Sequence, residues 1–233
     1  MTTQLDPPAI PHRQWLGGLG IVSGIFLGVA AVATNQGPGI NASATAVAAY
    51  YNSHHTNSEI GIFLVLIGCV ALAFFSGALR NTAFPSAARD RGLMSVSALG
   101  TAVWISGLLL TAALQTTLLD ASHYGHAAVI QSVNYLAADD FFPVVIGLSI
   151  FAIATGAGIL RSRVLPGWLG WVTIALGVLA AAGPLGGIAY LIAPVWALVT
   201  GVMLLLRRTG STAVSQPGIA ADVARGAASS AQR

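Results

Sequence analysis

Six apolar segments, each close to the length of a membrane-spanning helix, constrain the fold of this chain more than any other feature. They cover residues 14–34, 60–79, 94–118, 141–160, 164–182 and 188–206. A helix of about 20 residues is ~30 Å long, which matches the hydrocarbon core of a bilayer. The segments lack a period of two, and helices satisfy their own backbone groups in lipid. The sequence therefore predicts an all-α transmembrane bundle of six helices.

The composition excludes a water-soluble domain. Hydrophobic residues make up 55% of the chain and charged residues only 7%, whereas a soluble domain carries ~25% charged residues. Cys69 is the single cysteine, which excludes a disulfide framework and a dithiol redox cycle within the chain. The net charge is +3, and the charged residues lie between the apolar segments and at the ends of the chain. The expected partner is therefore the lipid bilayer, and no nucleic-acid partner is expected.

The arginines indicate how the bundle is oriented. All ten basic residues are arginine, and none lies in the loops 35–59 and 119–140. The positive-inside rule therefore places both termini in the cytoplasm. We expect residues 1–13 to be a flexible cytoplasmic N-terminus, residues 14–208 the six-helix domain, and residues 209–233 a disordered cytoplasmic tail.

Two parts of this topology stay open. Arg13 precedes an apolar stretch that ends in Ala31-Val32-Ala33, so cleavage of residues 14–33 as a signal peptide is the alternative to a retained span. The glycines and proline near Pro184 predict a tight turn between the last two spans. The alternative is a re-entrant segment within residues 164–206.

The two arginine-free loops have helical patterns of their own. Ser43 is suited to cap a short helix, and another short helix precedes Asp139 and Asp140. Apolar or aromatic faces with helical spacing are formed by Val47, Tyr50, Tyr51 and His54 in the first, and by Val129, Val133, Leu136 and Ala137 in the second. Short amphipathic helices on the outer face are predicted, and the alternative is that both extend neighbouring spans.

Small residues recur every four positions within the apolar segments, which is typical of helices that approach closely. The positions are Gly20, Gly24 and Gly28, Ala73 with Gly77, Ala152 with Gly156, and Ala197 with Gly201. Packing within the chain is the simpler interpretation. Association with a second copy or with another membrane protein is the alternative.

The outer loops also hold the only residues that suggest a metal site. Imidazole and carboxylate groups are ligands of zinc and other divalent ions, and they are supplied here by His54, Asp120, His123, His126 and Asp139. The competing interpretation is that these are solvated loop residues. The six apolar segments contain no Asp, Glu, His or Arg, which argues against a proton-driven pump. Gln115, Thr116 and Thr117 remain available to a neutral solute. No other cofactor and no catalytic residue is predicted.

Several short motifs resemble those of uncharacterised actinobacterial multi-pass integral membrane proteins, classed as a domain of unknown function. The motifs are Ala48-Ala49-Tyr50-Tyr51 followed by His54, Leu79-Arg80, Phe142-Pro143, and Leu165-Pro166-Gly167-Trp168-Leu169-Gly170-Trp171. The likeness covers residues 14–208 and implies a helical bundle in a bacterial cytoplasmic membrane. It implies no activity and no catalytic residues.

Three functional hypotheses follow. The first is a non-enzymatic structural, assembly or regulatory membrane component that acts through contacts with lipids or other helices. The second is an outward-facing metal-binding protein or metal-dependent enzyme. The third is a channel or carrier for a neutral or lipophilic solute.

Overall fold

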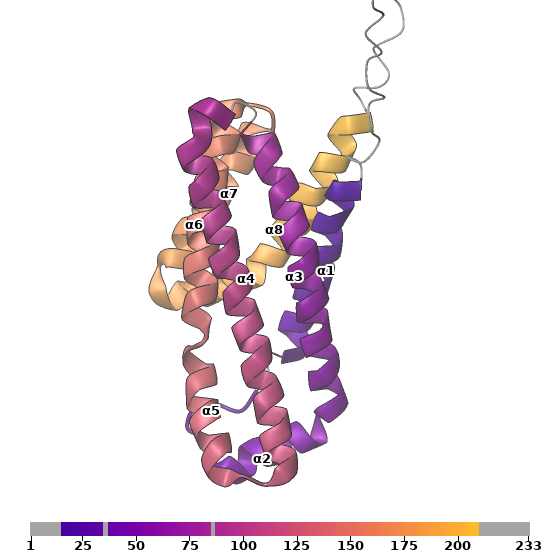
Figure 1. Cartoon of the computed structure of the whole chain (residues 1–233), viewed down its shortest axis with the longest axis vertical. Coiled ribbons are helices and arrows are strands. Elements are labelled where there is room, and N and C mark those ends of the chain that lie inside the picture. The colour runs from indigo at the N-terminus through magenta and orange to yellow at the C-terminus, as the bar shows by residue number, and fades with distance from the viewer. Residues whose placement is uncertain (1–14, 35–36, 85–86, 210–233) are drawn as a thin grey trace, which may run out of the picture.

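A computed structural model describes residues 15–34, 37–84 and 87–209, and this part of the chain is helical with short connections and no strand (Figure 1). The tails predicted to be flexible or disordered, 1–13 and 209–233, lie outside the described residues except for Thr209, which ends the last helix. The all-helical prediction is confirmed for the described residues.

Eight α-helices and one short 3₁₀ helix succeed one another along the described chain. They are α1 (Trp15–Thr34), α2 (Ala44–Ser53), α3 (His55–Ala83), α4 (Ala87–Tyr124), α5 (Ala127–Asp139), α6 (Phe141–Ser162), α7 (Gly167–Ala181), η2 (Gly183–Leu185) and α8 (Gly186–Thr209). The six predicted segments fall in α1, α3, α4, α6, α7 and α8. The fifth is shorter than predicted, because Pro166 precedes the first residue of α7.

Four stretches of the described chain are long and apolar enough to cross a membrane. They are His55–Ala83, Asp90–Tyr124, Ala127–Ser162 and Gly186–Leu206. Shorter apolar helices cover Gly17–Ala33 and Gly167–Ala181, and the 15 residues of α7 rise only ~22 Å. The chain is thus a helical protein whose composition suits a membrane.

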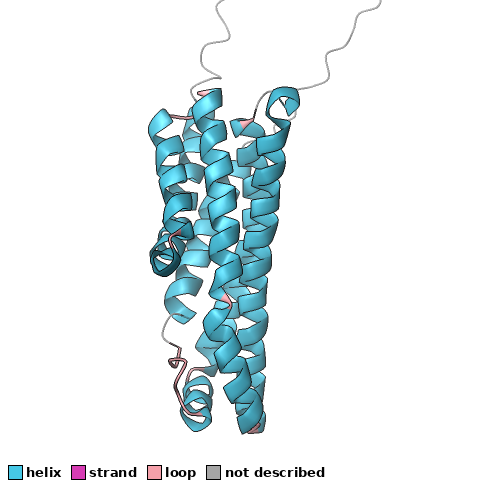
Figure 2. Ribbon diagram, turned by 90° about the vertical axis from the view of Figure 1, so that its left-hand side faces the viewer, coloured by secondary structure: helices cyan, strands magenta, loops and turns pink. Residues whose placement is uncertain are grey.

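The helices form two parts along the long axis, which we call the body and the cap. In the body, α6 packs against α4 and α7, and α1 packs against α3 and α8. The cap consists of α2 and α5 with the adjoining ends of α3 and α4, at the opposite end from the start of α1 and the end of α8 (Figures 1 and 2). One residue separates each cap helix from the long helix that follows it: His54 before α3 and Asp140 before α6.

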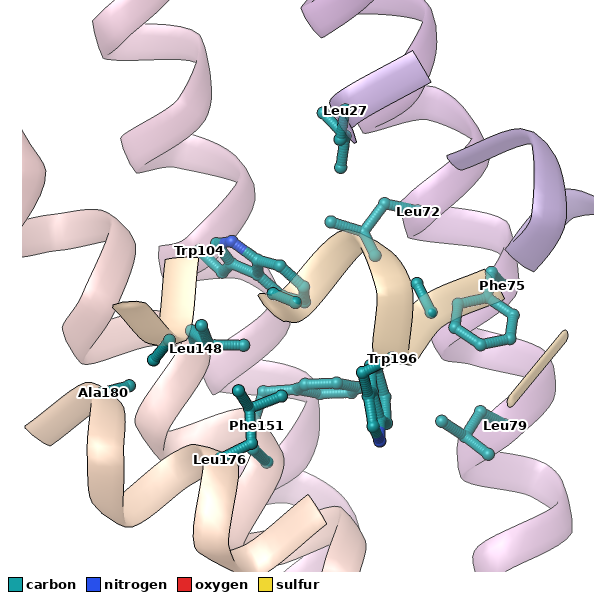
Figure 3. Packing of buried hydrophobic residues seen from close by; sticks show 14 of the residues in the cluster. Leu27, Leu72, Phe75, Leu79, Trp104, Leu148, Phe151, Leu176, Ala180 and Trp196 are labelled. Atoms are coloured by element: carbon teal, nitrogen blue, oxygen red, sulfur yellow. The ribbon is translucent and has the colours of Figure 1, made fainter. Parts of the chain in front are cut away.

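Four aromatic rings from four helices meet in the centre of the body. Trp196 of α8 packs edge-on against Phe151 of α6 and Phe75 of α3, with ring centroids 5.8 and 6.3 Å apart. Trp104 of α4 lies 5.7 Å from Phe151 on the other side. Figure 3 shows this row of rings with the leucines that surround it. Edge-to-face pairs of this kind add ~0.5–1.5 kcal/mol each to the burial of the rings.

Of the four predicted sets of small residues, three pack against other helices of the same chain. A Cβ atom on Gly24 would lie 2.5 Å from the carbonyl oxygen of Pro194, and one on Gly201 would lie 2.8 Å from the carbonyl oxygen of Gly17. Gly156 is equally close to Gly170 of α7, and Ala152 and Ala197 are buried. Gly20 faces Phe75, and Gly28 faces Pro194 at a looser 3.5 Å. These small residues therefore permit the close approach of α1 to α8 and of α6 to α7.

The remaining pair, Ala73 and Gly77 on α3, does not take part in this packing. Ala73 is exposed, and a Cβ atom on Gly77 would meet nothing within 4 Å. The same side of α3 exposes Phe63, Val70 and Phe74. This face is therefore open in the single chain.

The closest approach of all joins α4 and α6. A Cβ atom on Gly100 would collide with the backbone nitrogen of Phe151, and one on Gly147 would collide with that of Trp104. Neither position belongs to the small-xxx-small pairs that the sequence suggested. Because the obstacle is backbone in both cases, it cannot be relieved by a rotamer change.

Two buried polar contacts join helices inside the body. The Trp196 indole N–H donates to the hydroxyl oxygen of Thr173 at 2.9 Å, and that hydroxyl donates to the carbonyl of Leu169 at 2.6 Å. Ser97 and Thr155 share a hydrogen bond of 2.8 Å between α4 and α6. In hydrocarbon such pairs give each helix a defined partner at ~0.6–2 kcal/mol apiece.

We predict opposite effects from two glycine substitutions. Gly147→Leu places a side chain against the backbone of Trp104, so it should lower the free energy of unfolding by about 3 kcal/mol. Gly77→Ala, on the open face of α3, should raise it by up to ~1 kcal/mol because alanine favours the helix. Thermal unfolding in mild detergent, followed by circular dichroism, measures both. Equal stability of the two variants would contradict the backbone contact.

Candidate binding cavity beneath the cap

The cap has a hydrophobic core of its own. Ser43 accepts a hydrogen bond from the backbone N–H of Ala46 at 3.3 Å, which confirms it as the N-cap of α2. Val47 and Tyr51 then face inward from α2. They form a cluster, separate from that of the body, with Leu118, Leu119 and Ala121 of α4 and Ile130 of α5.

The predicted apolar face of α5 is turned inward only in part. Val133 and Ala137 pack against this cluster, but Val129 and Leu136 are exposed, and Ile130 and Asn134 are buried instead. The α5 helix packs against the end of α4 on one side and α2 on another, and this rotates the buried stripe away from the most apolar one. Asn134 is buried because its side-chain amide donates to the carbonyl of Gly39 at 3.4 Å.

A cavity of about 280 Å³ lies between the cap and the body. Its walls come from the end of α1, the loop after it, α2, α4, α5 and the first turns of α6 and α8. Six lining residues carry polar side chains: Tyr51, Thr111, Gln115, Asn134, Asp140 and Tyr190. The rest of the lining is mainly apolar, including Ala31, Phe141 and Val144. A pocket of this mixed character, with a volume just below the ~300–1,000 Å³ range of ligand sites, is a candidate binding site.

Asp140 is the only charged residue among the described residues that line this cavity. It stands between α5 and α6, and its side chain makes no capping hydrogen bond to α6. Thr111 lines the same cavity, and its hydroxyl donates to the carbonyl of Gly107 at 3.2 Å. Among the described residues, the one ion pair joins His55 and Glu59 at 3.5 Å, so Asp140 has no cationic partner there.

The phenol of Tyr51 is close enough to feel this carboxylate. Burial, with smaller contributions from the neighbouring Tyr50 and Asp140, raises the pKa of Tyr51 to about 12. Tyr51 therefore stays protonated at any physiological pH and presents a neutral ring and hydroxyl to the cavity.

The residues predicted to bind metal are not brought together as a set by the described structure. No group of three or more His, Cys, Asp or Glu side chains that could hold a metal ion occurs among the described residues. His54 instead stacks on Tyr50, with ring centroids 4.5 Å apart. Three further candidates are exposed: Asp120, His123 and His126. The side chain of Asp139 lies outside the described part of the chain, so the zinc site stays a prediction.

Most polar residues that line the cavity were not predicted as site residues from the sequence. Gln115 lines it, but Thr116 and Thr117, suggested alongside it, donate to carbonyl groups one turn earlier in α4. Asp140 appeared only as an acidic residue of an outer loop, and Tyr190 only as part of an apolar span. The available signal was the pair Asp139-Asp140 between two apolar runs, which leaves a carboxylate at the junction of two helices.

We predict that the cap is stabilised separately by its own core. Ile130 is 2% exposed, whereas Leu136 on the same helix is 59% exposed. Ile130→Ala should cost ~2–5 kcal/mol of local stability, because it leaves a void in the cap. Hydrogen exchange should then accelerate in α2 and α5 but not in α6 and α7. Leu136→Ala is the matched control, and faster exchange throughout the body with Ile130→Ala would contradict a separate core.

A scan against protein-family models and searches of curated proteins and solved structures find no significant match to this chain. Its function is therefore inferred from the contacts, burial and charges of its own residues.

Proposed function

We propose that this protein is a non-enzymatic component of a bacterial cytoplasmic membrane that acts through contacts with lipid and with other helices. The observation that carries the proposal is the surface of the body, where large apolar side chains stay exposed on the long helices. Examples are Phe63 on α3, Leu99 on α4, Ile146 on α6 and Val195 on α8, which are 67, 60, 52 and 61% exposed. In water, large apolar side chains exposed on every long helix of the body would favour association, whereas lipid solvates them.

The proposed topology has six spans, with both termini in the cytoplasm. Its support is the distribution of charge over the two ends of the bundle. The C-terminal ends of α3, α6 and α8 and the N-terminal end of α4 lie at the end opposite the cap, and they carry Arg80, Arg161, Arg207 and Arg91. The positive-inside rule then puts the cap outside the cytoplasm.

The two shorter apolar helices, α1 and α7, complete the six spans in this proposal. The helix α7 is continued by η2, and the start of α8 packs against the first turns of α6, where a Cβ atom on Gly186 would lie 3.2 Å from side-chain atoms of Phe141 and Val145. The α7–α8 turn therefore lies level with the cap end of α6. A tight turn at that level favours two membrane-crossing helices, and not a re-entrant segment, for residues 164–206.

The open face of α3 is the surface available to a neighbouring helix. Ala73 and Gly77 line it, and their small side chains would let a partner approach closely. A second copy of the chain and a different membrane protein both remain compatible with this face, and lipid covers it in the absence of either.

Single cysteines test the topology in a Cys69→Ala background. We expect a membrane-impermeant maleimide to label His123→Cys and Leu185→Cys in intact cells, and Arg91→Cys only after permeabilisation. All three side chains are exposed in the folded chain, so folding does not block the reagent. Labelling of positions 91 and 123 from the same side would contradict the proposed orientation. Protection of position 185 from the outside would contradict six spans.

A further inference from the structure

An apolar groove lies between α1 and α8, next to the cavity beneath the cap. It has a volume of about 210 Å³ and is lined on the α1 side by Gly24, Gly28 and Ala31 and on the α8 side by Leu191, Pro194 and Leu198. Ala31 also lines the cavity. The groove and the cavity are therefore adjacent, with one residue common to their walls.

The groove exists because the two helices diverge toward the cap. At Gly24 they touch, since a Cβ atom there would lie 2.5 Å from the Pro194 carbonyl oxygen. At Gly28, one turn nearer the cap, the corresponding distance to the Pro194 side chain is already 3.5 Å. The same divergence is visible in Figure 1, where α8 inclines away from α1 below their contact. The resulting wedge is apolar and narrow, as an alkyl chain requires.

The same helix faces continue from the groove into the cavity. On α8, Tyr190 lines the cavity and Pro194, four residues later, lines the groove. On α1, Ala31 lines the cavity and Gly28, three residues earlier on the same helix face, lines the groove. A ligand that follows these faces passes from a wholly apolar wall to one that holds a carboxylate.

The charged and aromatic side chains of the cavity indicate the chemistry of the head group that such a ligand would carry. Asp140 supplies a half-buried negative charge with no cationic partner among the described residues. Tyr51, Phe141 and Tyr190 line the same cavity, and aromatic rings near a carboxylate are the usual environment of an ammonium group. No basic residue lines it in the part of the chain that the structure describes, so a phosphate group would find no counter-charge among these residues.

We propose that the cavity and groove together bind a single-chain amphiphile with an ammonium head, the head beside Asp140 and the alkyl chain between α1 and α8. This rests on the proposed function, because the groove opens toward lipid only if the body lies in the membrane. Partial burial of a carboxylate without a counter-charge costs stability, and a bound cation would offset that cost. This proposal specifies one class of lipid-like molecule that the protein would bind within its proposed function.

Photo-crosslinking tests this proposal on the full-length protein in phosphatidylcholine nanodiscs. The probe is a long-chain primary alkylamine with a diazirine in its chain. Labelled peptides should come from α1 and α8 around Gly28 and Leu191, and an unlabelled alkylamine should compete. Asp140→Asn should weaken this competition about tenfold, as expected for loss of one charged contact. Glu59→Gln is the matched control, because Glu59 is an exposed carboxylate at the same end that pairs with His55.

Gly28→Leu provides an independent second variant. It fills the groove without changing any charge, and it should reduce labelling to a similar extent while the variant keeps the helical circular dichroism of the parent. Unchanged competition in Asp140→Asn would overturn the proposal, as would a long-chain alcohol that competes as well as the amine. Ethylamine that competes at the same concentration as the long-chain amine would overturn the part assigned to the groove.

The outcomes are separable from those of the topology test. Correct sidedness of the single cysteines together with charge-independent labelling would overturn this site alone. Wrong sidedness at positions 91 and 123 would overturn the proposed function, whatever the labelling shows.

Discussion

The direct contact of backbone with backbone between α4 and α6 is the constraint on which the rest of the structure depends. Gly100 and Gly147 leave no room for a Cβ atom at this crossing, so the two helices lie against each other along much of their length. Trp104 and Phe151 are carried by the same two helices and project into the centre, where Trp196 completes the row. The position of α8, and hence the wedge beside α1, follows from that row of rings.

This crossing also determines where the cavity lies. The α4 helix has 38 residues, a rise of ~57 Å, whereas a bilayer core needs ~30 Å. Its excess length extends past the start of α6 and provides the surface on which α2 and α5 pack. The cavity is the space left where the six-helix arrangement of the body gives way to the smaller arrangement of the cap. Asp140 is there because the chain changes direction at that level.

The sequence predicted the parts of the fold that depend on local pattern. Apolar runs located the long helices, Ser43 located the start of α2, and small-residue spacing identified Gly24, Gly156 and Gly201 as contact points. It did not identify Gly100 or Gly147, because single glycines in apolar runs carry no periodic signal. Nor did it predict the rotation of α5, which depends on packing against α2 and α4 and not on the apolarity of α5 alone.

The candidate site was less predictable than the fold, since its residues come from six helices and a loop. The sequence indicated His54, Asp120, His123 and His126 of the outer loops as candidate ligands, yet these four side chains are exposed. Tyr51, Asp140 and Tyr190 are instead neighbours only in three dimensions. Their convergence depends on the tertiary arrangement of α2, α6 and α8, which no spacing within the chain encodes.

The one-residue connections at His54 and Asp140 have a mechanical consequence. A single residue cannot span a gap, so the last turn of α2 stays next to the first turn of α3, and the last turn of α5 stays next to the first turn of α6. If the body lies in a bilayer as proposed, a change in the tilt of α3 or α6 displaces the attached end of a cap helix. The shape of the cavity beside Asp140 would then respond to the thickness of the lipid.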